Sequence, residues 1–267
     1  MEIIGYSERG IINSLFYEIK YSQKSINLLN QFLSLMSFPY RTVDFQISEA
    51  KILIEQSFSD FGDADVVLLL DNQDKKQVIF IEAKVKTFQK SSWNIKDEFD
   101  KFEALFIENN QEASKISKSS SSKSNLFVQL YFKVKMVRAL QTGGMKQLKE
   151  GVVFPECLSK QDKRTHKKCL PRKIGNNEVV LTATKLLLPY SKDALFVALV
   201  PSNTSELNKF YQETLKNYRL SKNKDWEVEN WGYISWTDVK KFCKKNRLEN
   251  TLRVFEFNKG QIYDDGN

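Results

Sequence analysis

Two short apolar runs separated by a polar stretch predict a β-hairpin in the first half of the chain. Residues 66–70 read Val-Val-Leu-Leu-Leu and residues 78–81 read Val-Ile-Phe-Ile, whereas residues 71–77 are polar and rich in turn formers. Uninterrupted apolar runs of this length are typical of strands buried on both faces. Turn formers between two such runs favour an antiparallel connection. We expect Leu70 to pair with Val78 in this hairpin.

Three charged residues flank the apolar runs at one end of the expected hairpin. Asp65 precedes the first run, and Glu82 and Lys84 follow the second. The expected register sets residue 65 opposite residue 83, so that Asp65 lies diagonal to Glu82 and Lys84, which share one face of the strand. Two carboxylates buried side by side repel each other. A divalent cation held between Asp65 and Glu82 would remove that cost.

An Asp at a strand start, followed by a Glu-x-Lys tripeptide at the end of the next strand, resembles the motif of the PD-(D/E)xK nuclease superfamily. The resemblance covers about residues 1–140, and Ala64 stands where the motif's name has Pro. It implies that Asp65, Glu82 and the Ala83 carbonyl bind a metal ion, and that Lys84 orients or helps deprotonate the attacking water. The alternative is a solvated ion pair at a sheet edge, which contributes little to stability.

A further carboxylate lies on a helix predicted for residues 7–20. Its apolar residues follow the spacing of one buried helix face, and they are Ile11, Ile12, Leu15, Phe16 and Ile19. Successive residues turn by about 100° around a helix, so Glu8 projects into the middle of this face and Glu18 lies about 90° from its centre. The resemblance implies that Glu8 reaches the metal, with Glu18 as the second candidate. Alternatively, Glu8 lies in the first turn because carboxylates favour a helix N-terminus.

Residues 126–140 predict a helix that is apolar nearly all round and therefore buried against the sheet. Gln129 and Lys133 are four residues apart and share one face. Exonuclease-like members of the superfamily carry a Gln on this helix, so the resemblance implies that Gln129 contacts the metal-bound water or the scissile phosphate. Lys133 stands where those enzymes often have Tyr and is a candidate nucleic-acid contact. Solvation of both side chains on the only polar edge of the helix is the alternative.

The second half of the chain contains further strand and helix signals. Residues 194–200 are uniformly apolar and predict a buried strand, and residues 231–235 predict a short one. Asn203 and Ser235 each stand three residues before a carboxylate, a spacing that opens a helix. We therefore expect an α/β fold with a mixed central sheet and helices on both faces. This is the restriction-endonuclease-like architecture that the resemblance implies, elaborated at its C-terminal side.

Length and composition favour one elaborated domain over residues 1–267, with the catalytic core in about residues 1–140. The chain is 41% hydrophobic, enough for one sizeable core. It contains neither a run of about 18 apolar residues nor a signal peptide, so we expect a cytoplasmic protein that does not contact a membrane.

The cysteines point to neither disulfides nor zinc. They are three in number, Cys157, Cys169 and Cys243, and no export signal precedes them, so disulfides are not expected. The spacing of Cys157, Cys169 and the single histidine, His166, matches no standard zinc motif.

Positive charge is concentrated in one segment. The formal net charge is +8, and residues 160–173 contain seven Lys or Arg residues and one Asp, a net of +6. A nucleic-acid backbone is the natural partner of such a segment, and Lys163, Arg164, Lys167 and Lys168 are the candidate phosphate contacts. A solvated lysine-rich loop is the alternative.

Together with these features, the resemblance implies a Mg²⁺-dependent nuclease, with Mn²⁺ as a substitute ion, acting on DNA rather than RNA in restriction, repair or defence. A homodimer is compatible with this function. Asp65, Glu82 and Glu8 would hold the ion, which lowers the pKa of a coordinated water, and Lys84 would stabilise charge that develops on the phosphate. Two alternatives are a nucleic-acid-binding protein that does not cleave, and an interaction protein in which Asp65, Glu82 and Lys84 form a salt-bridge network.

Overall fold

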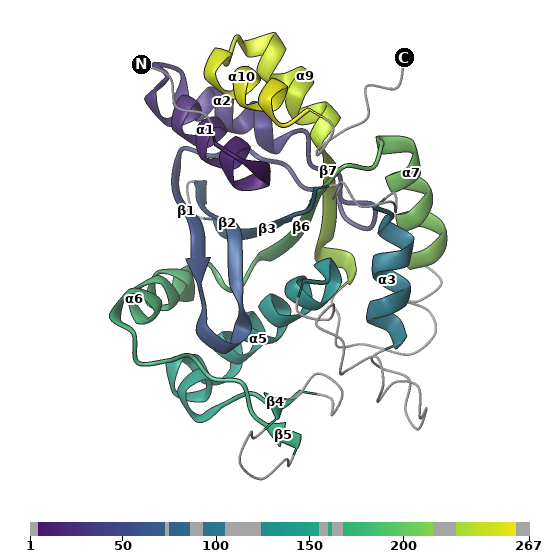
Figure 1. The fold of residues 1–267 in the computed structure, drawn as a ribbon. Helices are drawn as coiled ribbons and strands as arrows, with labels where there is room; N and C mark the ends of the chain where they lie inside the picture. Colours follow the sequence, from purple (N-terminus) through teal and green to yellow (C-terminus); the bar gives the residue numbers. More distant parts are fainter. Residues whose placement is uncertain are drawn as a thin grey trace.

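The chain folds around a five-stranded mixed sheet with helices on both faces (Figure 1). The structure is a computed structural model that describes residues 5–72, 75–85, 93–104, 124–154, 160–161, 168–215 and 228–259. In their order across the sheet, the strands are β1 (Glu49–Ser57), β2 (Asp63–Asn72), β3 (Lys75–Ala83), β6 (Ala194–Val200) and β7 (Trp231–Ser235). The first three strands are antiparallel, and β3, β6 and β7 are parallel. The predicted α/β class and mixed central sheet are confirmed.

The predicted hairpin of β2 and β3 is present, but its expected register is wrong by one residue. Leu70 pairs with Gln77 rather than with Val78, and the ladder continues to a pair between Asn72 and Lys75. Backbone pairing does not require apolar side chains, so most of the polar stretch belongs to the strands. The short connection then sets the register.

Among the described residues, four helices cover one face of the sheet, and they bring the first two and the last two helices of the chain into one layer (Figure 1). They are α1 (Ser7–Tyr21), α2 (Ser25–Leu33), α9 (Trp236–Asn246) and α10 (Glu249–Phe257). The helix expected from residue 7 is confirmed, and all five residues of its predicted apolar face are buried. The capping signal before α9 is also confirmed, because the Ser235 hydroxyl accepts a hydrogen bond from the Asp238 amide at 3.0 Å.

The opposite face of the sheet is covered by the long helix α5 (Leu126–Glu150). Around it lie α3 (Ile95–Ala104), α6 (Glu178–Leu187), and α7 (Thr204–Lys209) with its π-helical extension Phe210–Leu215. Two short strands, β4 (Lys160–Gln161) and β5 (Lys168–Leu170), pair apart from the main sheet. Within the described ranges, no helix has the length and apolarity needed to cross a membrane.

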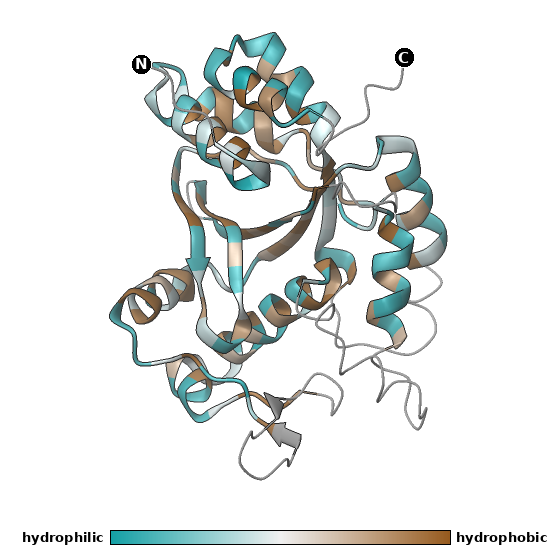
Figure 2. Cartoon of the chain, in the orientation of Figure 1, coloured by the Kyte–Doolittle hydropathy of each residue, from teal (hydrophilic) through white to brown (hydrophobic). Residues whose placement is uncertain are grey.

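Side chains of β3 alternate between two apolar layers. Val78 and Phe80 pack on the α5 side, whereas Ile79 and Ile81 pack on the α1 side. In Figure 2 the central strands are largely hydrophobic, while the surrounding helices mix hydrophilic and hydrophobic residues. The alternation predicts that Glu82 faces α5 from the end of β3.

Candidate functional site

The candidate site lies at the carboxyl end of β3, where β2 begins. Val66 pairs with Ile81, so the same register continued by one residue sets Asp65 opposite Glu82. Asp65 Oδ2 accepts a hydrogen bond from the Ala83 amide at 2.7 Å. This bond holds Asp65 against β3.

Glu82 is a buried carboxylate with unused acceptor capacity. Its side chain is 1% exposed, and among the described residues neither carboxylate oxygen receives a hydrogen bond. The nearest positive charge is the Lys133 ammonium, whose Nζ lies 3.4 Å from Oε1 as an ion pair. Burial raises the pKa of Glu82 to about 7, while the charge of Lys133 opposes this rise and that of Asp65 adds to it. Such a carboxylate lacks the donors that buried acceptors normally have.

Lys133 is fully buried, which contradicts its expected role as a nucleic-acid contact and also its alternative as a solvated side chain. Its side chain is 0% exposed. The ammonium donates hydrogen bonds to the carbonyls of Phe61 and Asp63, both at 2.9 Å, and pairs with Glu82. A lysine in this position cannot present its charge to a phosphate backbone. Burial lowers its pKa and Glu82 opposes that shift.

Lys84 is held at both its backbone and its side chain. Its amide donates to the Leu199 carbonyl at 2.9 Å, and its carbonyl accepts from Trp236 Nε1 at 2.8 Å. Its ammonium donates to Gln129 Oε1 on α5. Gln129 and Lys133, four residues apart on α5, thus reach Lys84 and Glu82 respectively. The prediction that Glu82 and Lys84 share one face of the strand agrees with these contacts.

Glu8 comes to the same region from the first turn of α1. Burial raises the pKa of its carboxyl, the negative charge of Asp65 raises it further, and the positive charge of Lys84 lowers it. These charges act on Glu8 because α1 directs it toward the end of the β2–β3 hairpin. The Ser7 hydroxyl donates a hydrogen bond to its carboxylate. The charges of the candidate site therefore act on Glu8, but its carboxylate is hydrogen-bonded to Ser7 in its own helix.

The segment before α1 is fixed by Asn258 at the end of α10. Asn258 Oδ1 accepts from the Ser7 amide at 2.7 Å, and its Nδ2 donates to the Gly5 carbonyl at 3.0 Å. Ser7 has a positive φ of 64°, and a Cβ on Gly10 would clash with the backbone of Gly5. The first turn of α1 is therefore sterically constrained. The sequence analysis missed Asn258, because its contacts are 251 and 253 residues away.

Glu18, the second candidate on α1, has a different role. Its carboxylate accepts hydrogen bonds from the amide and hydroxyl of Thr251, at 2.8 and 2.6 Å. Both bonds satisfy donors in the first turn of α10. Of the two helix carboxylates considered from the sequence, the structure therefore brings Glu8 and not Glu18 toward Asp65.

The oxygen atoms of Asp65 and Glu82 are of the kind that a hard cation prefers, although the described residues contain no ready-made cluster. Within the described ranges, no three Asp, Glu, His or Cys side chains are grouped closely enough to hold a metal ion. Mg²⁺ and Mn²⁺ prefer oxygen ligands. Among the described residues, both oxygens of Glu82 are buried without a hydrogen-bond donor, and only Oε1 has an ammonium nearby; this unused capacity is the observation that fits a cation. Glu8 would have to leave the Ser7 hydroxyl to join them.

Most of the basic segment lies outside the described residues. This applies to Lys163, Arg164 and Lys167 and to the side chain of Lys168, as it does to Cys157, His166 and the side chain of Cys169. Arg172, from the same segment, is described. Its guanidinium lies 3.9 Å from the centre of the Phe132 ring and donates to the Asp60 carbonyl. That cation is therefore bound to the body of the protein.

The comparisons with known proteins give no relative. No family model, no curated protein and no solved structure matches the chain. The fold defines an α/β protein with a mixed five-stranded sheet, and its candidate site combines carboxylates, a lysine and a glutamine at the end of β3. Any assignment of function rests on that geometry.

Proposed function

We propose that this chain is a metal-dependent nuclease of the PD-(D/E)xK type, with a restriction-endonuclease-like fold, that hydrolyses phosphodiester bonds in DNA. The observation that carries the proposal is the carboxylate of Glu82, which is 1% exposed and whose oxygens receive no hydrogen bond among the described residues. Asp65 and Lys84 stand beside it at the strand end. A buried carboxylate without donors is costly unless a cation completes it.

The residues of the site have separate roles in this proposal. Asp65, Glu82 and the Ala83 carbonyl would hold Mg²⁺ or Mn²⁺, with Glu8 as a further ligand. The bound ion would supply Lewis acidity and a coordinated water of lowered pKa. Lys84, oriented by Gln129, would stabilise negative charge as it builds on the phosphate. The net charge of +8 and the basic segment favour a nucleic-acid substrate.

One observation favours a second candidate, an interaction protein with a structural ion-pair network. Glu82 has a cationic neighbour in Lys133, which is equally buried. The pairing differs from the network expected from the sequence, in which Lys84 was the partner. If the pair alone satisfied Glu82, the site would have no need of a metal ion. Cleavage and metal binding separate the two candidates.

The test is cleavage of circular and linear DNA with Mg²⁺ or Mn²⁺. Asp65→Ala, Glu82→Ala and Lys84→Ala should each lower the rate by at least about a hundredfold, as expected on removing a group that stabilises a transition state. Their effects should not add, because they act as one unit. Asp44→Ala and Lys51→Ala remove exposed charges of the same kinds and should cleave like wild type. Wild-type cleavage by an Asp65 or Glu82 variant would refute the proposed mechanism.

A further inference from the structure

We infer that Trp236, in the C-terminal half of the chain, is a positioning residue for Lys84, because its indole N–H holds the Lys84 peptide group where the sheet provides no donor. This inference rests on the proposed nuclease function. It extends the residues on which cleavage depends beyond about residues 1–140, where the sequence analysis expected the catalytic core.

Lys84 stands where the pairing of β3 with β6 ends. The two strands are parallel, and the Lys84 amide donates to the Leu199 carbonyl at 2.9 Å. If the parallel ladder continued regularly, the Lys84 carbonyl would accept from the amide of residue 201, two positions beyond Leu199. Residue 201 is a proline and has no N–H. The ladder therefore cannot supply this donor to Lys84.

Trp236 supplies the missing donor. Its Nε1 donates to the Lys84 carbonyl at 2.8 Å, and donating is the only hydrogen-bonding function of an indole N–H. Trp236 is the first residue of α9, directly after β7, and it is 0% exposed. Its ring packs edge-on against Phe255 of α10, with the ring centres 6.1 Å apart. The packing of the C-terminal helices therefore fixes the donor, and through it the Lys84 peptide group.

The position of the Lys84 side chain depends on this backbone. β3 ends at Ala83, so the bonds to Leu199 and Trp236 hold the backbone of Lys84 beyond the end of the strand. The ammonium is held at its other end by Gln129. A group that stabilises charge in a transition state requires accurate placement, because a displacement of about 1 Å can cost about a hundredfold in rate. Trp236 acts on the reaction through Lys84 and does not itself touch the substrate.

The kinetics of DNA cleavage by Trp236→Phe test the inference. Phenylalanine keeps an aromatic ring against Phe255 and removes the N–H donor. With Mg²⁺, kcat should fall at least about tenfold, while KM should stay within about twofold, because Lys84 is proposed to act on charge that develops only in the transition state. Trp231→Phe is the matched control. Trp231 is also 0% exposed but packs in the apolar layer on the α5 side, so its variant should keep the wild-type kcat.

A double-mutant cycle separates positioning from a general loss of structure. In the Lys84→Ala background, Trp236→Phe should lower the residual kcat no further, because the side chain that it positions is absent. An equal loss in both backgrounds would overturn the inference and leave the nuclease proposal standing, as would a wild-type kcat in Trp236→Phe. No cleavage by wild type would refute both. If Trp236→Phe does not fold, benzothienylalanine at position 236 serves in its place, since it keeps the two-ring shape and has sulfur instead of the N–H.

Discussion

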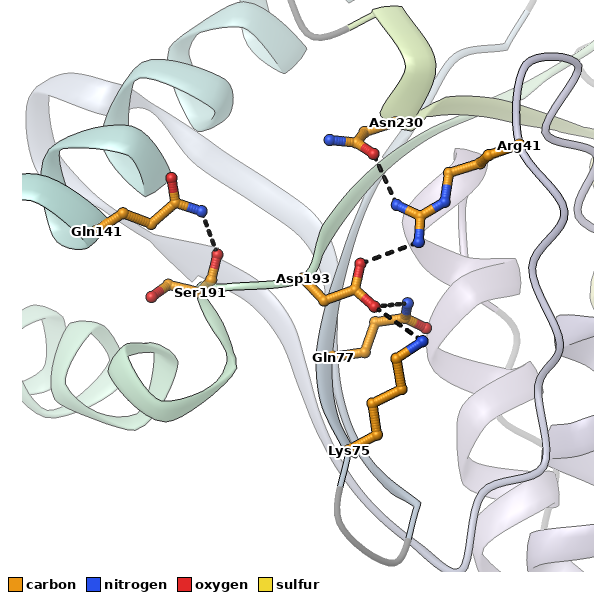
Figure 3. A network of polar contacts seen from close by, with 7 residues as sticks. All are labelled: Arg41, Lys75, Gln77, Gln141, Ser191, Asp193 and Asn230. Carbon is orange, nitrogen blue, oxygen red and sulfur yellow. Dashed lines mark hydrogen bonds and ion pairs between the residues drawn. The ribbon is translucent and has the colours of Figure 1, made fainter.

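Two carboxylates at opposite ends of the parallel strands meet very different environments. Asp193, directly before β6, accepts hydrogen bonds from Arg41 at 3.2 Å and Gln77 at 2.7 Å and pairs with Lys75 at 3.5 Å (Figure 3). Glu82, at the end of β3, is more deeply buried and has one ammonium at 3.4 Å. Among the described residues, Asp193 therefore has three positively charged or hydrogen-bonding partners, whereas Glu82 has a single ammonium nearby and no hydrogen-bond donor.

The difference is the one expected if Asp193 has a structural role and Glu82 a chemical one. Arg41 also donates to Asn230 at 2.7 Å, so the Asp193 network connects segments that are distant in sequence (Figure 3). A carboxylate with saturated acceptors has little capacity left for a ligand. A buried carboxylate without donors has that capacity, and perturbed groups of this kind are concentrated at functional sites. Stability, divalent-ion binding and pH dependence should therefore differ between the Asp193 site and the Glu82 site.

The largest expected effect is on stability at the Asp193 end. Asp193→Ala leaves the Arg41 guanidinium and the Gln77 amide without their acceptor and should lower the free energy of unfolding by about 3 kcal/mol. Asp65→Asn should change it by less than about 0.5 kcal/mol, because an amide oxygen still accepts from Ala83 and repulsion between carboxylates is relieved. Urea unfolding without divalent ions measures both. Equal losses of unfolding free energy in Asp193→Ala and Asp65→Asn would contradict the proposed difference between the two sites.

The next effect is stabilisation by a divalent ion. Mg²⁺ at a hundredfold excess over its dissociation constant should stabilise wild type by about 2.7 kcal/mol. The stabilisation should persist in Asp193→Asn and disappear in Asp65→Asn and Glu82→Gln, because only the last two remove proposed ligands. Thermal unfolding at constant ionic strength provides the measurement. An equal response to Mg²⁺ in all four proteins would place the ion elsewhere.

Much of the fold and part of the site could be predicted from local sequence patterns. Charges at the ends of apolar runs singled out Asp65, Glu82 and Lys84 as candidate site residues, and helical periodicity predicted that Glu8 points inward. These patterns depend on neighbours in sequence. The register of the hairpin could not be read in the same way, because polar residues of the turn region also pair as strand. A one-residue shift followed, although the three charges still meet at one end of the hairpin.

Long-range partners were not predicted. The ion pair of Glu82 with Lys133 joins a strand to a helix across a large separation in sequence, and the sequence assigned Lys133 to a nucleic-acid contact instead. A signal was available, since Lys133 stands between Phe132 and Val134 in a helix that is apolar nearly all round. A buried lysine requires a buried acceptor. No local sequence pattern predicts the contacts of Asn258, because they depend on the packing of α10 against α1.

A smaller effect is expected at Asn258. Asn258→Ala removes the hydrogen bonds to Gly5 and Ser7 and should cost about 2 kcal/mol of stability. It should also weaken Mn²⁺ binding severalfold, because the first turn of α1 no longer holds Glu8 near Asp65. Asn246→Ala, which removes a bond to Phe242 within α9, is the control and should bind Mn²⁺ like wild type. Unchanged Mn²⁺ binding by Asn258→Ala would exclude Glu8 as a ligand.

The smallest expected effect is a dependence of stability on pH in the protein without divalent ions. The pKa of Glu82 in the folded chain is about 7, above its ordinary value of 4.5. Between these values the folded state binds more protons at this position than the unfolded state does, so the free energy of unfolding should fall as the pH rises. The slope from one group stays below about 1.4 kcal/mol per pH unit.

Two variants assign this slope to its source. Glu82→Gln cannot ionise, so its free energy of unfolding should depend less on pH over that range. Asp193→Asn, at the other end of the parallel strands, is the control and should retain the wild-type slope. Urea unfolding with a chelator present measures both. If Glu82→Gln keeps the full wild-type slope, the slope comes from another carboxyl group, such as Glu8, whose pKa is also raised by burial, and the contrast between the two carboxylates is weaker than their hydrogen bonds indicate.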